Sequence, residues 1–255
     1  MGKSVSSRID DGVATLTLSR PPLNILNMEM MQDLLEELAH ATSGRGIKAV
    51  VLRSGLPGVF SAGADIRDHL PPQTEGFIKT FEKLVSSLAF FPRPTVSAVR
   101  GKCLGGGMEL ALACDFVVAE EGSTFGQPEV NLGVYPPAAA AIYPRLVGLK
   151  AASDIVLTGR SISADEAYSL GFITSVARPG ELDSKCDEIL EALRSKSSQV
   201  LGVAKRAMLD CLSLPLGEAL TKSSTLYLEE LMKMQDPQEG LASFMEKRKP
   251  HWQDG

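Results

Sequence analysis

The sequence predicts an α/β fold built from stacked strand–strand–helix (ββα) units, followed by a helical C-terminal region. In two places, residues 47–90 and 95–113, a short apolar run leads into a glycine turn and then into a helical pattern. From Ala138 onward the pattern is mainly helical. A repeated strand–turn–helix unit favours stacked ββα turns over a doubly wound sheet. We therefore expect one folding unit with a helical C-terminal extension.

The first half of the chain supplies most of the expected strands. They cover residues 5–9, 13–18, 47–52, 95–99, 116–119 and 172–176. The first two alternate apolar and polar residues around Asp11-Gly12, a pattern typical of a β-hairpin. Arg20-Pro21-Pro22 ends the second strand, because proline cannot donate to a sheet ladder. The third is continuously apolar, which indicates a strand buried on both faces.

Helical patterns follow the strands and then dominate. The expected helices cover residues 28–41, 76–90, 108–113, 138–147, 150–158, 164–170, 183–195, 199–211, 216–234 and a short segment after Gly240. Asn27 is the expected N-cap of the first helix. Gly171 is placed to end the helix that begins after Ser163. The polar stretch 71–75 is expected to be mobile.

Composition limits the function. The chain has 255 residues, 44% of them hydrophobic, and a formal net charge of −5. Without a long basic run we expect no nucleic-acid partner, and without an apolar run of about 20 residues no membrane span. The four cysteines show no C-x-x-C spacing and the three histidines are scattered. We therefore expect reduced thiols, a cytoplasmic location and no metal site.

Residues 101–137 hold the strongest functional signal. Gly105, Gly106 and Gly107 run directly into a helix-forming segment that carries Glu109, and Glu129 follows after a strand-like run. Glycines let a ligand approach the backbone, and the N–H groups of a helix start point at whatever lies in front of them. Two carboxylates beside such donors suit acid/base chemistry next to an anion hole. The alternative is a packing loop with two solvated glutamates.

Three motifs narrow this choice. They are FSAGAD at 60–65, GxxLGGGMELALACD at 101–115 and FGQPEVxLG at 125–133. In this order and spacing they resemble the crotonase (enoyl-CoA hydratase/isomerase) superfamily, and the similarity runs from Arg20-Pro21 to FMEKRKP at 244–250. The resemblance implies a crotonase-like spiral of ββα repeats over residues 1–195. Residues 196–255 would form a C-terminal helical oligomerisation region, since relatives are usually trimers or dimers of trimers.

The resemblance also implies the chemistry. An α,β-unsaturated acyl-CoA thioester would accept water at its β carbon through an enolate, whose oxygen is held by the N–H groups of Ala64 and Gly106. Glu109 and Glu129 occupy the positions of the two catalytic glutamates of the hydratases. Family isomerases commonly keep only one such acid, so the pair favours a hydratase. An isomerase and a non-catalytic acyl-CoA-binding protein remain the alternatives.

One segment departs from the ordinary hydratase pattern. Where those enzymes have G-T-I-P-G-A-G-G, this chain has Gly133-Val134-Tyr135-Pro136-Pro137-Ala138-Ala139-Ala140. Pro137 stands in place of a glycine whose N–H helps to hold the catalytic water, and proline has no N–H. We expect Pro136, Pro137 and Ala138 to shape the acyl pocket. The run resembles the cyclohexa-1,5-diene-1-carbonyl-CoA hydratases, so a straight-chain and a cyclic dienoyl substrate carry similar weight.

For the coenzyme A part of the substrate, the resemblance implies binding by the loops beside the first motif. These positions are Pro22, Leu23, Ser61, Ala62, Asp65, Ile66 and Arg67. Lys247-Arg248-Lys249 is a further candidate phosphate partner, from a neighbouring subunit or as an ordinary cationic helix end. No cofactor beyond the CoA moiety is expected. The expected partners are the acyl-CoA substrate and further copies of this chain in a homotrimer or homohexamer.

Overall fold

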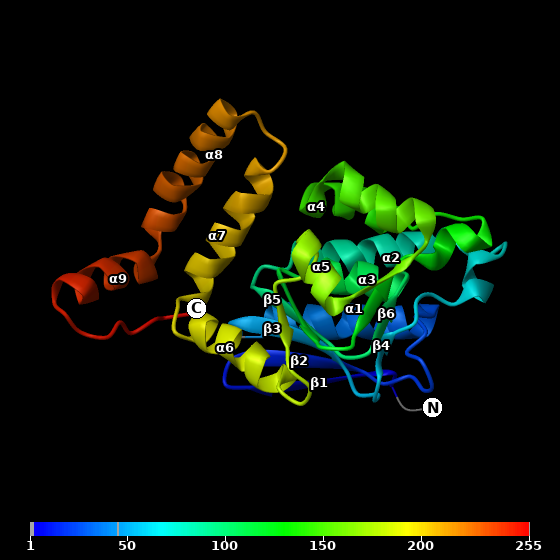
Figure 1. Ribbon diagram of the computed structural model, residues 1–255. Coiled ribbons are helices and arrows are strands. Elements are labelled where there is room, and N and C mark those ends of the chain that lie inside the picture. Colours follow the sequence, from blue (N-terminus) through cyan, green and yellow to red (C-terminus); the bar gives the residue numbers. More distant parts are fainter. Residues whose placement is uncertain (1–2, 45, 255) are drawn as a thin grey trace.

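The computed structural model describes residues 3–44 and 46–254, which form two sheets covered by helices (Figure 1). The strands are β1 (Val5–Asp10), β2 (Val13–Leu18), β3 (Ala49–Ser54), β4 (Val59–Ser61), β5 (Thr95–Val99), β6 (Lys102–Leu104), β7 (Phe116–Glu120), β8 (Thr124–Gly126), β9 (Ser161–Ser163) and β10 (Ser175–Ala177). The first sheet has the order β1-β2-β3-β5-β7-β10 and is parallel apart from the β1–β2 hairpin. The second has the order β4-β6-β8-β9, in which only β9 runs antiparallel.

Helices follow the strands and then continue alone to the C-terminus. They are α1 (Met28–Ser43), α2 (Thr74–Ala89), α3 (Gly106–Leu112), α4 (Pro137–Thr158), α5 (Ala164–Leu170), α6 (Leu182–Arg194), α7 (Ser198–Cys211), α8 (Leu216–Glu229) and α9 (Gln235–Met245). Short 3-10 turns are η1 (Ile66–His69), η2 (Pro128–Leu132) and η3 (Leu231–Lys233). No helix of the described ranges is long and apolar enough to cross a membrane.

The chain repeats one ββα unit. The units β3-β4-α2, β5-β6-α3 and β7-β8-α4 each place their first strand in the larger sheet and their second in the smaller one. Parallel neighbours within both sheets follow from this repeat, since equivalent strands enter in the same direction. The predicted spiral of ββα units is confirmed.

The larger sheet is buried on both faces. Along β3, Val50 and Leu52 pack into the main core with the helices α1–α5, whereas Ala49 and Val51 pack against α6 on the opposite face. Alternate side chains of a strand point to opposite faces, so a sheet covered on both sides needs a continuous apolar run. This explains why the third expected strand lacks polar alternation.

Several local predictions are confirmed and two are wrong. Asn27 caps α1 by accepting the N–H of Met30 at 3.0 Å. The expected break between helices 138–147 and 150–158 is Gly148, whose backbone is non-helical within α4. The strand expected at 172–176 is instead β10, because Phe172 and Ile173 are buried in the core and only the following residues pair with β7. The single helix expected over 216–234 ends at Glu229 and is followed by η3. The last two residues of the stretch 71–75 belong to α2, which begins at Thr74, and the expected mobility of the stretch stays a prediction.

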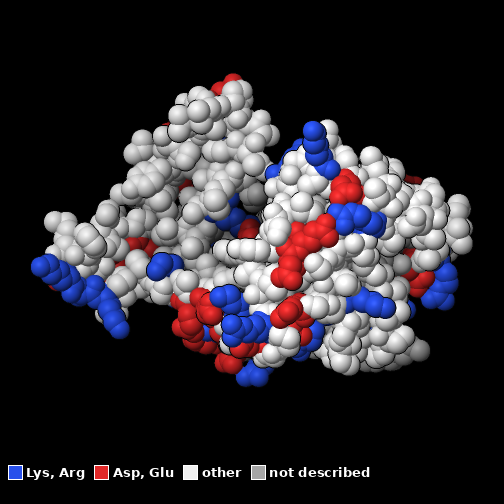
Figure 2. Space-filling model, viewed as in Figure 1, with Lys and Arg blue, Asp and Glu red and all other residues white. Residues whose placement is uncertain are grey.

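Helices α7, α8 and α9 extend away from the sheets (Figure 1). Near its middle, α7 is fixed to the core by Lys205, which is 5% exposed and whose Nζ donates to Asp115 Oδ2 at 2.7 Å. Beyond that contact α7 packs mainly along α8. The face of α7 and α8 that Figure 2 shows carries few charged side chains.

Candidate active site

The glycine turn before α3 forms the centre of the site. Gly105 has a φ of +52° and precedes α3, which begins at Gly106. A Cβ on Gly105 would lie 2.5 Å from Glu129 Oε1, and one on Gly107 would lie 2.7 Å from Ser61 Cβ. These two positions therefore have no space for a side chain. The three glycines let α3 start directly against the β4 loop and the second glutamate.

Two backbone N–H groups belong to the segments that meet at this turn. Gly63 lies beside Gly105 and Gly106, since a Cβ on Gly63 would be 3.8 Å from Gly106 N. The loop 62–65 is fixed by its neighbours on both sides, because Ala62 N donates to Leu23 O and Asp65 N donates to Leu26 O. Among the described residues the N–H groups of Ala64 and Gly106 have no hydrogen-bond acceptor. Adjacent free donors are suited to bind a developing oxyanion.

Glu109 lies behind the turn, in the first turn of α3. Its side chain is buried, and its Oε1 accepts the N–H of Ala139 at 2.7 Å. Ala139 is in the first turn of α4, where backbone N–H groups lack helical partners and favour a carboxylate. The start of α4 therefore holds the carboxyl of Glu109 in place.

Glu129 approaches the same turn from η2, with its Oε1 against Gly105. The buried side chain of Gln127 accompanies it. With the amide of Gln127 oriented to satisfy both neighbours, its nitrogen lies 3.1 and 2.9 Å from Glu129 Oε1 and Oε2, and its oxygen accepts the Tyr143 hydroxyl. An amide orientation is assigned from such partners. Glu129 is thus held at both oxygens.

Both glutamates have raised pKa values. Burial, opposed by the N–H of Ala139 and aided by the charge of Glu129, raises the pKa of Glu109 to about 8. Burial also raises the pKa of Glu129 to about 7. Near neutral pH such a pair can hold one proton between its two carboxyls. One carboxyl can then accept a proton while the other donates one.

Comparison with known proteins shows the family of this chain. The family model described as enoyl-CoA hydratase/isomerase matches residues 8–255. The chain belongs to the enoyl-CoA hydratase/isomerase family. It is 36% identical over 248 residues to a cyclohexa-1,5-dienecarbonyl-CoA hydratase of Thauera aromatica, covering 96% of this chain and 94% of the relative. It is 37% identical over 240 residues to a probable enoyl-CoA hydratase of Rhizobium meliloti (strain 1021), covering 93% of each.

Solved structures agree with the fold. An enoyl-CoA hydratase from Bacillus anthracis superposes with a TM-score of 0.93 at 29% identity, covering 99% of this chain and 100% of that one. One from Mycobacterium smegmatis gives a TM-score of 0.91 at 26% identity, covering 98% of both chains. The crotonase-like fold and the family resemblance predicted from the three motifs are therefore confirmed.

The residues predicted to bind CoA lie on the loops beside the glycine turn, but their side chains differ in exposure to solvent. Pro22, Leu23, Ile66 and Arg67 are exposed. Ser61 is fully buried, and its hydroxyl donates to Asn24 O at 2.7 Å. Asp65 is also buried and pairs with Arg67 at 2.8 Å, which lowers the pKa of the Asp65 carboxyl. Ser61 and Asp65 thus hold the loop through hydrogen bonds, whereas the Arg67 side chain is exposed and already paired with Asp65.

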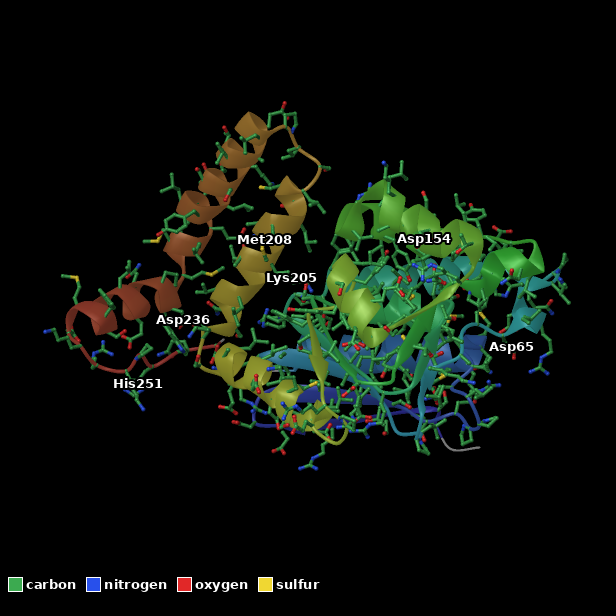
Figure 3. The ribbon with its side chains drawn as sticks, viewed as in Figure 1. Asp65, Asp154, Lys205, Met208, Asp236 and His251 are labelled. Atoms are coloured by element: carbon green, nitrogen blue, oxygen red, sulfur yellow. The ribbon has the colours of Figure 1, made fainter. Side chains whose placement is uncertain are left out.

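The basic triplet 247–249 is not near this loop in the same chain. Figure 3 labels Asp65 at one end of the molecule and His251, which follows the triplet, at the other. Arg248 is paired with Glu239 at 2.6 Å and with Glu246 at 2.6 Å. A phosphate contact from the triplet would therefore have to reach a neighbouring subunit.

The predicted acyl-pocket residues form the start of α4. Pro137 is the first residue of the helix and is exposed, whereas Pro136 is buried and Ala138 is half-buried. Proline suits this position, because the first helical N–H needs no intrahelical partner. The next donors serve Glu109. Pro136, Pro137 and Ala138 are therefore adjacent to the glutamate pair.

Sequence reasoning missed three groups that hold the two glutamates in place, directly or through a neighbour: the side chains of Gln127 and Tyr143 and the N–H of Ala139. Gln127 lies two residues before Glu129 in a conspicuous motif, and that spacing was the available signal. Tyr143 has no local signal, since its position depends on how α4 packs against α3, η2 and Phe172. Within the described ranges, no group of three or more His, Cys, Asp or Glu side chains could hold a metal ion.

Proposed function

We propose that this protein is a hydratase that adds water across the α,β double bond of an acyl-CoA thioester. The observation that carries the proposal is the single cluster formed by the free N–H groups of Ala64 and Gly106 and the carboxyls of Glu109 and Glu129. Family membership and the hydratases among its relatives support the same reaction class.

The reaction follows from this arrangement. The thioester oxygen receives the N–H groups of Ala64 and Gly106, which stabilise the enolate that forms as the water oxygen bonds to the β carbon. One carboxylate takes a proton from that water, and the other carboxyl gives its proton to the α carbon. The pair begins and ends with one proton, so water is consumed without any other reactant. Removing one oxyanion donor typically costs about 3–4 kcal/mol in such sites.

For the substrate we propose an enoyl- or cyclic dienoyl-CoA. Pro136, Pro137 and Ala138 lie where the acyl group would meet the glutamates, and the relative from Thauera aromatica is named for a cyclic dienoyl-CoA. The proposed CoA contacts are the backbone of Ser61 and Ala62, the exposed side chains of Pro22, Leu23, Ile66 and Arg67, and Asp65 through its hold on Arg67. No cofactor beyond the CoA moiety enters the proposed reaction.

We further propose that residues 196–255 form the subunit contacts of a homotrimer or homohexamer. The helices there expose large apolar side chains, which monomeric proteins rarely gather in one region. They are Met208, Leu212, Leu216, Leu220, Tyr227, Leu228, Leu241, Phe244 and Met245. Subunit packing would also bring Lys247-Arg248-Lys249 to a neighbouring CoA site. Four unpaired cysteines support a reducing, cytoplasmic location.

A paired hydration assay tests the proposal. Purified protein receives crotonyl-CoA and, separately, cyclohexa-1,5-diene-1-carbonyl-CoA, and the products are separated by chromatography. Turnover of crotonyl-CoA indicates a general enoyl-CoA hydratase, and turnover of the cyclic diene alone indicates a pocket reshaped at Pro136–Ala138. If neither is hydrated, the proposal fails, and an isomerase or an acyl-CoA-binding protein takes its place. An isomerase would keep its activity in Glu129→Gln, whereas a hydratase would lose it.

A further inference from the structure

Tyr143 places a phenol hydroxyl inside the protein, behind the glutamate pair. The residue lies on α4, its side chain is fully buried, and its ring meets the edge of Phe172 with ring centroids 5.2 Å apart. A buried hydroxyl needs a partner, because leaving it unpaired costs free energy. That partner is the side-chain amide of Gln127, which is also fully buried.

The amide of Gln127 has two possible orientations, and the charge on Glu129 selects between them. When Glu129 is ionised, both its oxygens are acceptors, so the amide nitrogen must face them and the amide oxygen must accept from Tyr143. When Glu129 carries a proton, it can donate to the amide oxygen, and the amide nitrogen then donates to Tyr143. A phenol hydroxyl serves both arrangements, since it can donate or accept. Phenylalanine or leucine at this position could serve neither.

Other titratable groups around this chain of hydrogen bonds stay neutral or belong to the site. Burial raises the pKa of Tyr143 and that of Cys103 on β6 well above their usual ranges. Glu109 on α3 is the remaining ionisable group that faces Tyr143 and Glu129 among the described residues. Glu129 is therefore the group whose charge the Tyr143–Gln127 pair meets directly.

We propose that Tyr143 is a positioning residue of the hydration reaction, acting through Gln127 to hold the Glu129 carboxyl in both of its protonation states and to favour the ionised one. The inference rests on the proposed hydratase function. Tyr143 does not touch the substrate. It orients the amide that touches Glu129, and a chain of hydrogen bonds ending on a charge is strengthened by each member.

The variant Tyr143→Phe isolates the hydroxyl, because it keeps the ring that packs on Phe172. We expect kcat to fall about five- to tenfold with KM changed less than about twofold, as for loss of one indirect hydrogen bond to a charged group. The limb of the pH profile that belongs to Glu129 should move to higher pH by about half a unit to one unit. The variant Gln127→Met should give larger changes in the same direction. Adding Tyr143→Phe to Gln127→Met should change little more, because the hydroxyl acts through the amide.

Two measurements test the inference. The first compares kcat and its pH profile in the wild type, the two single variants, the double variant and the control Tyr168→Phe, which removes a hydroxyl from an exposed tyrosine on α5. The second titrates the protonated carboxyl band of Glu129 by pH-difference infrared spectroscopy, with Glu129→Gln identifying the band. A raised Glu129 pKa in Tyr143→Phe, absent in Tyr168→Phe, supports the inference. An unchanged Glu129 pKa, or equal effects of Tyr143→Phe with and without Gln127→Met, overturns it.

The infrared titration also separates this inference from the proposed function. If the wild type hydrates no acyl-CoA, the proposed function fails, yet the titration still reports whether Tyr143 and Gln127 set the charge of Glu129. If the wild type is active and the titration is unaffected by Tyr143→Phe, only the present inference fails. Thermal unfolding of each variant confirms that the compared proteins are folded.

Discussion

The carboxyls of Glu109 and Glu129 are both shielded from water by burial, but they have different hydrogen-bond partners. Glu109 is 3% exposed and accepts the N–H of Ala139 at the start of α4, whereas Glu129 is half-buried and meets the amide of Gln127. Burial raises both pKa values into the neutral range, to about 8 and about 7. General acid/base groups work best when their pKa lies near the operating pH. At the scale of single residues, the site is thus prepared for proton transfer in both directions.

Replacing either glutamate by glutamine should remove most activity. In Glu109→Gln and in Glu129→Gln we expect kcat to fall by about 10²–10⁴, the usual contribution of one acid/base group. Steady-state kinetics on whichever acyl-CoA the wild type hydrates is the measurement. Glu121→Gln, which changes an exposed glutamate on the turn after β7, is the matched control and should be unaffected. Retained activity in Glu129→Gln would instead indicate a one-acid isomerase.

The raised pKa of Glu109 also predicts how stability changes with pH. Because its pKa rises from an ordinary value of 4.5 to about 8 on folding, the folded state binds more protons than the unfolded state between those values. Stability from this residue is therefore present below pH 4.5 and is lost as pH rises through 8. Glu109→Gln should be more stable than the wild type at pH 9, by on the order of 2–4 kcal/mol, and nearly equal at pH 4. Urea unfolding at both values checks this, and an equal difference at both would contradict it.

Gly105 tests whether the glycine turn positions Glu129. A side chain here would strike Glu129 Oε1, and the φ of +52° adds backbone strain. In Gly105→Ala we expect kcat to drop by at least about tenfold, since a displaced acid/base group loses most of its contribution. Gly122→Ala supplies the control, because Gly122 also has a positive φ but has open space around its Cβ position. Equal kinetic losses in the two variants would count against a role in positioning.

At the scale of elements, the site forms where three loops meet the starts of two helices. The loop after β4 brings Ala64, and the turn after β6 brings Gly106 at the start of α3. The segment after β8 brings Glu129 and then the start of α4, whose N–H holds Glu109. The second strands of the three units, β4, β6 and β8, run parallel to one another. Their carboxyl ends therefore lie at the same end of the smaller sheet, and the loops that follow them gather there. The stacking of units that defines the fold thereby assembles the site.

Local signals predicted the parts of this arrangement that depend on neighbouring residues in sequence. The β1–β2 hairpin, the Asn27 cap and the helix carrying Glu109 follow from turn, cap and glycine chemistry. The contacts of Tyr143 and Ala139 could not be predicted, because they depend on how α4 folds back over α3. The strand near residue 172 was misplaced because an apolar run predicts burial equally well in a strand and in a core loop.

The ion pair of Lys205 with Asp115 helps to attach helix α7 to the core. Lys205 reaches Asp115, which also accepts the backbone N–H and hydroxyl of Thr95. Lys205→Met should lower the free energy of unfolding by about 1–3 kcal/mol, less than for a fully buried pair because Asp115 is partly exposed. Lys222→Met, which breaks the exposed pair with Asp210, should cost less than about 0.5 kcal/mol. Urea unfolding that ranks the two variants in the opposite order would contradict this view of α7.

At the scale of the whole molecule, a closed spiral core contrasts with an open helical arm. The core buries two continuous apolar clusters, whereas α8 and α9 expose leucine, phenylalanine and methionine side chains. Figure 2 shows few charges over the arm formed by α7 and α8. Such a surface is stable in water when another protein surface covers it. The arm is therefore where we place the contacts between copies of this chain.

Self-association should depend on this arm. Sedimentation of the wild type should give a mass of three or six times 27.2 kDa. Leu220→Glu combined with Leu228→Glu should reduce the mass toward that of the single chain, since each places a charge on an exposed apolar site of α8. Ile9→Glu, at an exposed apolar site on β1, should leave it unchanged. A wild-type protein that sediments as a monomer would refute the proposed assembly.

The most direct test of the central claim is the source of the oxygen in the product. The wild type and Glu129→Gln are incubated with crotonyl-CoA and with cyclohexa-1,5-diene-1-carbonyl-CoA in water labelled with heavy oxygen, and the acyl-CoA products are analysed by mass spectrometry. The account predicts a hydroxyacyl-CoA carrying the labelled oxygen in the wild type and almost none in Glu129→Gln. A product with a shifted double bond and no labelled oxygen, formed equally by both proteins, would contradict it.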